Sequence, residues 1–74
     1  AQKVLLVGES PLMEELVDKI AERPELGWKV IGFLREEGGA GMRKTPELGT
    51  ISEVGRVAAE AHPDRIVVGL SERR

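Results

Sequence analysis

The stretch KVLLVG at residues 3–8 decides the fold of this chain. Its apolar residues follow one another without polar alternation, which indicates a strand buried on both faces, as in a parallel sheet covered by helices. Gly8 ends the run. Ser10 then offers an N-cap oxygen and Pro11 suits the first position of a helix. Apolar residues recur at helical spacing over residues 12–23, so the pattern predicts a strand followed by a helix.

A second strand is predicted over residues 28–34, in the sequence WKVIGFL. The connection to it over residues 9–27 fits a crossover helix and is too long for a hairpin turn, so the two strands should run parallel. Residues 35–46 are polar and rich in glycine, which predicts a loop. Residues 47–49 could form a very short strand or only an extended approach to the next helix.

The last third of the chain repeats the alternation of helix and strand. Thr50 to Glu53 matches a capping box, and apolar residues at helical spacing continue to Ala61. The residue before Pro63 resists the helical conformation, so the helix should end at His62. The apolar run RIVVGL at residues 65–70 predicts the final strand.

This alternation predicts an α/β fold with a parallel sheet of three or four strands. The expected lateral order is 3-2-1-4. Its two right-handed crossovers then run in opposite directions and place one helix on each face, in three α/β/α layers. The 74 residues form a single domain, residues 1–74.

Composition excludes several function classes. Eleven Lys and Arg against thirteen Asp and Glu give a net charge of −2, so there is no basic field to bind nucleic acid. No run is long enough to insert into a membrane, and cysteine is absent. His62 is the sole histidine, expected at a helix C-terminus, and it has no partners for a metal site or a catalytic dyad. We therefore expect no catalytic residue, no metal and no cofactor in this chain.

Two short helices cannot cover both faces of such a sheet, at about 10 Å per helix against about 4.8 Å per strand. Apolar strand surface should stay uncovered, with residues 66–70 as an open edge. From this we expect a fragment of a longer protein whose strip is covered by the rest of that protein or by a second copy. A homodimer would form through the uncovered sheet surface or the edge strand.

The loop after the first strand stands where dinucleotide-binding folds keep their phosphate loop. Of the three glycines of that fingerprint only Gly8 is present, since Ser10 and Met13 hold the other places. The Ser10 side chain should hinder the close approach of a pyrophosphate to the backbone, and the Met13 side chain should push the helix away from the strand. Glu9 adds a negative charge beside any bound phosphate. Plain N-capping is the simpler interpretation. The candidate ligand site is Gly8 and Ser10, with Arg35 after the second strand.

Four segments together resemble a known family. They are residues 3–8 (KVLLVG), 23–34 (RPELGWKVIGFL), 48–50 (LGT) and 64–70 (DRIVVGL). They resemble the Rossmann-like, CoA-binding-like domain that precedes the catalytic part of bacterial polyprenyl glycosylphosphotransferases. The ending SERR at residues 71–74 is similar to the branch found with exosortase-associated polysaccharide loci.

The resemblance implies a truncated Rossmann-like domain with a non-catalytic regulatory or assembly role. The parent would be a membrane-bound sugar transferase of exopolysaccharide biosynthesis. It would pass sugar-1-phosphate from a nucleotide sugar to undecaprenyl phosphate at the cytoplasmic side of the bacterial inner membrane. The catalytic residues and membrane helices of that family lie outside the matched segments. The alternative is a module that senses a nucleotide, a nucleotide sugar, NAD or CoA, with a nucleotide-sugar dehydratase or epimerase as parent.

Overall fold

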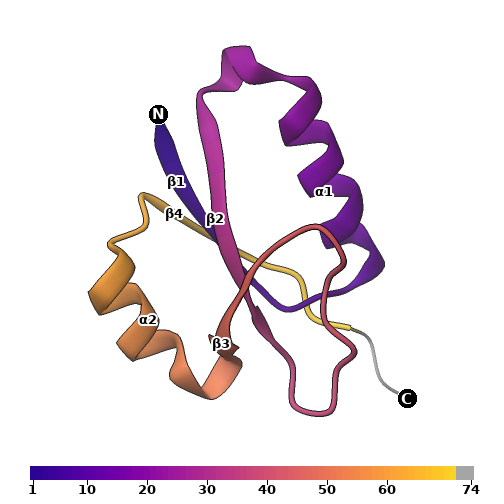
Figure 1. The fold of residues 1–74 in the computed structure, drawn as a ribbon, viewed down its shortest axis with the longest axis vertical. Coiled ribbons are helices and arrows are strands. Elements are labelled where there is room, and N and C mark those ends of the chain that lie inside the picture. Colours follow the sequence, from indigo (N-terminus) through magenta and orange to yellow (C-terminus); the bar gives the residue numbers. More distant parts are fainter. Residues whose placement is uncertain (72–74) are drawn as a thin grey trace.

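Four parallel strands form one sheet in the computed structural model, which describes residues 1–71 (Figure 1). The strands are β1 (Gln2–Val7), β2 (Trp28–Arg35), β3 (Glu47–Thr50) and β4 (Arg65–Val68). Their lateral order is β3-β2-β1-β4, which confirms the predicted order 3-2-1-4. The segment at residues 47–50 is therefore a strand, and it pairs with the end of β2.

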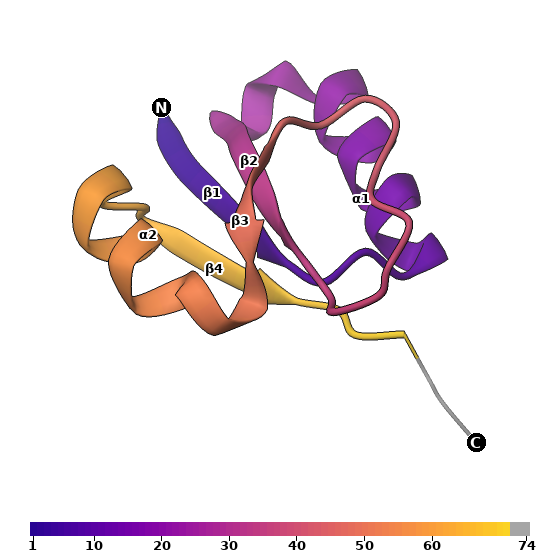
Figure 2. The ribbon, with the colours of Figure 1, turned by 60° about the horizontal axis from the view of Figure 1, so that its bottom comes forward.

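The two helices α1 (Pro11–Glu22) and α2 (Val54–Ala61) lie on opposite faces of the sheet (Figure 2). Alternate residues of β1 supply the two halves of the core. Val4 and Leu6 pack in a cluster with Met13 of α1. Leu5 and Val7 pack in a second cluster with Val57 of α2. One continuous apolar strand thus holds both helices, and the three-layer α/β/α prediction is confirmed.

The connections contain two short helices that were not predicted. A 3₁₀ turn, η1 (Pro24–Leu26), follows α1 and ends at Gly27, whose φ of 69° is left-handed. The predicted capping box forms, with the Glu53 carboxylate accepting the Thr50 backbone N–H at 2.9 Å. It caps a second 3₁₀ turn, η2 (Ile51–Glu53), which leads into α2.

The last strand is shorter than predicted, since β4 ends at Val68 and not at Leu70. Gly69 instead lies against the loop between β1 and α1, where its carbonyl accepts the backbone N–H of Ser10 at 3.3 Å. Of the ending SERR, residues 72–74 lie outside the described part of the chain. No helix within residues 1–71 is long and apolar enough to cross a membrane.

The open edge lies where it was predicted. Ile66, Val68 and Leu70 keep 49%, 63% and 55% of their surface exposed. The reason is that α2 packs against β1 and β2 through Leu5, Val7 and Leu34, so β4 lies beyond its cover. The residues Ile66, Val68 and Leu70 are called the β4 strip below.

Candidate functional site

The loop after β1 is packed directly against the segment after β4. Gly8 has a φ of 98°, and a Cβ added there would meet the carbonyl oxygen of Gly69. Its backbone N–H donates to the Leu34 carbonyl at 2.9 Å. Gly8 is therefore needed for a close approach of two backbones, which side chains exclude. The Gly69 carbonyl therefore lies directly against the loop that stands where dinucleotide-binding folds keep their phosphate loop.

Ser10 is the N-cap residue of α1, as predicted, but its side chain makes no capping hydrogen bond. The residue is buried, with 7% of its surface exposed. Its backbone carbonyl accepts the N–H of Met13 at 2.8 Å. The expectation that the Ser10 hydroxyl caps the helix is therefore wrong. Pro11 supplies the helix start, because its fixed φ suits the first helical position.

Met13 is accommodated by a glycine that sequence reasoning missed. Its side chain is 3% exposed and packs with Val4 and Leu6, and a Cβ on Gly69 would collide with it. The close approach that the dinucleotide fingerprint obtains from a glycine in the helix is obtained here from a glycine after the neighbouring strand. The signal was present, because Gly69 ends the run RIVVG as Gly8 ends KVLLVG.

Glu9 holds the long loop between β2 and β3. Its carboxylate accepts the backbone N–H of Glu36 at 2.7 Å and also the backbone N–H of Gly41. These amide groups belong to residues far along the chain, so no local pattern reveals the contact. The negative charge that was predicted to repel a phosphate itself occupies the amide groups of this loop.

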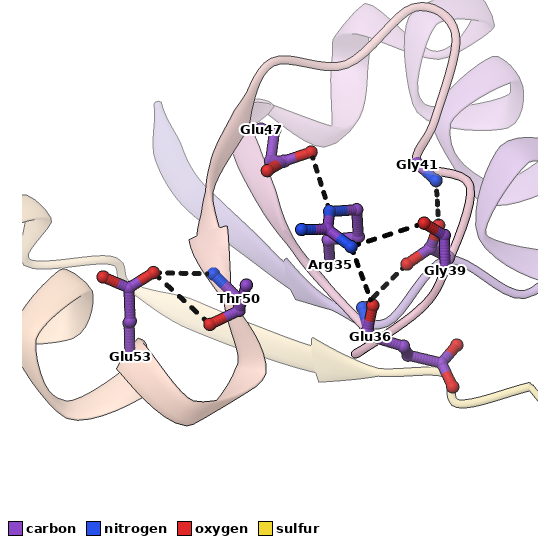
Figure 3. A network of polar contacts seen from close by, with 8 residues as sticks. Arg35, Glu36, Gly39, Gly41, Glu47, Thr50 and Glu53 are labelled. Atoms are coloured by element: carbon purple, nitrogen blue, oxygen red, sulfur yellow. Dashed lines mark hydrogen bonds and ion pairs between the residues drawn. The ribbon is translucent and has the colours of Figure 1, made fainter.

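Arg35 lies inside the same network (Figure 3). Its Nε is 3.2 Å from the Glu47 carboxylate, and its Nη1 donates to the carbonyls of Glu36 and Gly39 at 3.3 and 3.4 Å. The guanidinium thus connects β2, β3 and the loop. Within residues 1–71, the hydrogen bonds and the ion pair of the Arg35 guanidinium go to Glu36, Gly39 and Glu47, and not to Gly8 or Ser10. Ligand binding by Gly8, Ser10 and Arg35 stays a prediction.

A crevice of about 830 Å³ opens at the carboxyl ends of the strands, between the end of β2, η2 and the segment after β4. Arg35, Glu36 and Glu37 line it, together with Leu70 of the β4 strip. The Glu36 carboxylate accepts the Ser71 backbone N–H at 3.0 Å, which ties the loop to the end of β4. Two carboxylates and one arginine that is already paired make this crevice unfavourable for a phosphate.

Two further polar residues, Glu53 and His62, lie at the ends of the second helix and its preceding turn. Glu53 accepts hydrogen bonds from the Thr50 N–H and from Arg56, and these contacts lower the pKa of the Glu53 carboxyl below its usual value. His62 ends α2 in the left-handed conformation with a φ of 50°. Within residues 1–71, no group of three or more His, Asp or Glu side chains is placed to hold a metal ion.

Comparison with known proteins finds no matching family model, no matching curated protein and no matching solved structure.

Proposed function

We propose that this chain is a non-catalytic regulatory or assembly domain of a sugar transferase. The parent enzyme would pass sugar-1-phosphate from a nucleotide sugar to undecaprenyl phosphate in exopolysaccharide biosynthesis, at the cytoplasmic side of the bacterial inner membrane. The remainder of that enzyme would be the domain's first partner. The support for the transferase is the resemblance given above. The support for the non-catalytic role comes from the geometry of the sheet.

One observation carries the assembly role. The carboxyl edge of a parallel sheet is where α/β domains bind their ligands. In this chain, the part of that edge beside the loop after β1 is filled by the Glu9 carboxylate, which accepts two loop amide N–H groups, and by the Gly69 carbonyl, which lies against Gly8. Exposed apolar side chains also lie on the edge strand β4, at Ile66 and Val68. A phosphate loop that is filled in this way, beside an exposed apolar edge strand, favours contact with protein over contact with a nucleotide.

The residues that carry the resemblance fit this role. The sequence PELG forms η1 and the left-handed Gly27, and LGT forms the junction from β3 into η2. Both segments set the course of the backbone and contribute to turns and caps. Because the residues that carry the resemblance shape the backbone, they suit a domain whose role is to present a surface to a partner protein.

A thermal-shift screen tests the proposal. UDP-glucose, NAD and CoA, each at millimolar concentration, should leave the melting temperature unchanged. A ligand at a hundred times its Kd would add about 2.7 kcal/mol, which raises the melting temperature of a domain of this size by roughly 10 °C or more. Such a shift, lost on Arg35→Ala, would favour the sensing alternative and overturn the assembly role.

The encoding reading frame tests the parent enzyme. Downstream of Arg74 it should encode hydrophobic helices and a transferase catalytic domain. A nucleotide-sugar dehydratase there would support the alternative parent, and a stop codon directly after Arg74 would contradict both.

The sensing alternative has one observation in its favour. The crevice of about 830 Å³ lies at the carboxyl ends of the strands, where such ligands bind, and Arg35 lines it. Because the two glutamates beside Arg35 would repel a phosphate, a cation bound to the ligand would have to screen their charges, or the two side chains would have to move away.

A further inference from the structure

The outer edge of β4 offers backbone hydrogen bonds to a partner strand. The N–H of Gly69 donates to the Val7 carbonyl of β1 at 2.8 Å. Successive residues of a strand direct their backbone groups to alternate sides. The N–H and carbonyl groups of Ile66 and Val68 therefore point away from β1, at the edge of the sheet.

The same two residues present their side chains together on the face that carries α2. They pair with Leu5 and Val7, which belong to the α2 half of the core. Whereas Leu5 and Val7 are buried, Ile66 and Val68 are 49% and 63% exposed. The buried apolar layer under α2 thus continues outward onto β4 without cover.

The charged residue of β4 does not protect this edge. Proteins commonly guard an exposed edge strand with a charge that repels a second strand. Arg65 instead lies over the Trp28 ring, 5.1 Å from its centroid, and its Nε donates to the Gln2 side chain. Both contacts are with the starts of β1 and β2, so the guanidinium is turned back across its own sheet.

The amino end of the sheet is the more basic end and the carboxyl end the more acidic, although Asp64 lies at the amino end and Arg35 at the carboxyl end. Lys3, Lys29 and Arg65 are exposed at the amino ends of β1, β2 and β4. Glu9, Glu36 and Glu37 gather beyond the carboxyl ends of β1 and β2. An antiparallel neighbour would set the basic end of one sheet beside the acidic end of the other, whereas a parallel neighbour would set like charges together.

We propose that two copies of this domain pair β4 against β4 in antiparallel orientation, across a two-fold axis at Val67. Ile66 of each copy then lies opposite Val68 of the other. Both residues point their backbone groups into the interface, so each pair exchanges two hydrogen bonds. The two sheets become one sheet of eight strands, and the β4 strips join on a single face.

This pairing adds a second copy of the domain as a partner in the assembly role proposed above, and it rests on that role. The interface is small, because it consists of one short strand from each copy. The association is therefore weak and depends on concentration.

Sedimentation equilibrium from about 10 μM to about 1 mM tests the pairing, since this range covers weak associations. The weight-average molar mass should rise with concentration from that of the monomer toward that of the dimer. Val68→Lys should raise the Kd at least tenfold, because it places a charge in the edge and two like charges across the axis. Leu12→Lys is the matched control, since Leu12 is 71% exposed on α1, and its Kd should equal that of the unmodified chain.

A dilution series of amide NMR spectra on the unmodified chain needs no variant. Shifts that depend on concentration should centre on residues 66–68. A chain that stays monomeric to about 1 mM, or shifts confined to α1, would overturn the pairing. If nucleotides also fail to bind, the assembly role survives with another partner. Stabilisation by a nucleotide would instead overturn the assembly role itself.

Discussion

The two outer strands, β3 and β4, are each four residues long, yet their side chains are used in opposite ways. The side chains of β3 contact the rest of the domain, since Glu47 forms an ion pair with Arg35 and Leu48 packs on the α2 half of the core. β4 is held to β1 by its backbone and leaves Ile66 and Val68 exposed. A small sheet can finish one edge with its own side chains and leave the other as a surface for a partner.

The largest effect is expected from a substitution that disrupts the packing of the segment after β4 against the loop after β1. Gly8→Ala adds a Cβ against the Gly69 carbonyl at a φ of 98°, so we expect a loss of about 3 kcal/mol in urea unfolding. Gly38→Ala is the control, because Gly38 has a φ of 74° and open space around it, and it should lose about 1 kcal/mol. Equal losses would show that the contact with Gly69 does not matter.

A matched pair of truncations compares the two edges directly. Leu48→Ala should lower the free energy of unfolding by about 2 kcal/mol, because Leu48 is half-buried against the core. Val68→Ala should change it by less than about 0.5 kcal/mol in dilute solution, because most of that side chain is exposed. Similar losses at both sites would contradict the distinction between a finished and an open edge.

The loop beside β3 depends on one carboxylate. Glu9→Gln removes the charge that accepts the N–H groups of Glu36 and Gly41, and we expect a loss of about 1.5 kcal/mol. Amide hydrogen exchange at Gly41 should also become faster. Glu15→Gln, at an exposed position of α1, should do neither. Unchanged exchange at Gly41 would mean that Glu9 does not hold the loop.

The smallest effect concerns the cap that follows β3. The pKa of Glu53 is lowered by the Thr50 N–H and by Arg56, so its ionised form is favoured in the folded state. The resulting stability is present above the ordinary pKa of 4.5 and is lost as the pH falls through the lowered value. The difference in unfolding free energy between the unmodified chain and Glu53→Gln should therefore shrink on acidification. A difference that is constant with pH would contradict this account of the cap.

Local patterns predicted most of the fold. The run at residues 3–8 indicated a strand buried on both faces, the alternation of strands and helices indicated a parallel sheet with the expected order 3-2-1-4, and right-handed crossovers in that order predicted one helix on each face. The uncovered β4 strip also followed, from the small number of helices. Each of these inferences depends on periodicity or chain length, which a sequence displays directly.

The candidate site was less predictable, because its contacts join distant residues. The residues next to Glu9 in the sequence give no indication that its carboxylate accepts the N–H groups of Glu36 and Gly41. The residues next to Arg35 likewise give no indication of its ion pair with Glu47. Ser10 was expected to cap α1 with its hydroxyl, but the approach of Gly69 to its backbone buries it. The contact of Gly69 with Ser10 follows from the register of β4 against β1, and the contacts of Glu9 and Arg35 follow from the course of the loop between β2 and β3; the order of strands alone determines neither.

Hydrogen exchange at the amides of Ile66 and Val68 tests the central claim most directly, with Val67 as an internal reference because its N–H faces β1. In dilute solution, the amides of Ile66 and Val68 should exchange rapidly and that of Val67 slowly. In concentrated solution the exchange at Ile66 and Val68 should slow in proportion to the fraction of dimer, because a second β4 would then accept the outward N–H groups, while Val67 should not change. Rapid exchange at Ile66 and Val68 that does not change with concentration would contradict the claim that this edge receives another copy.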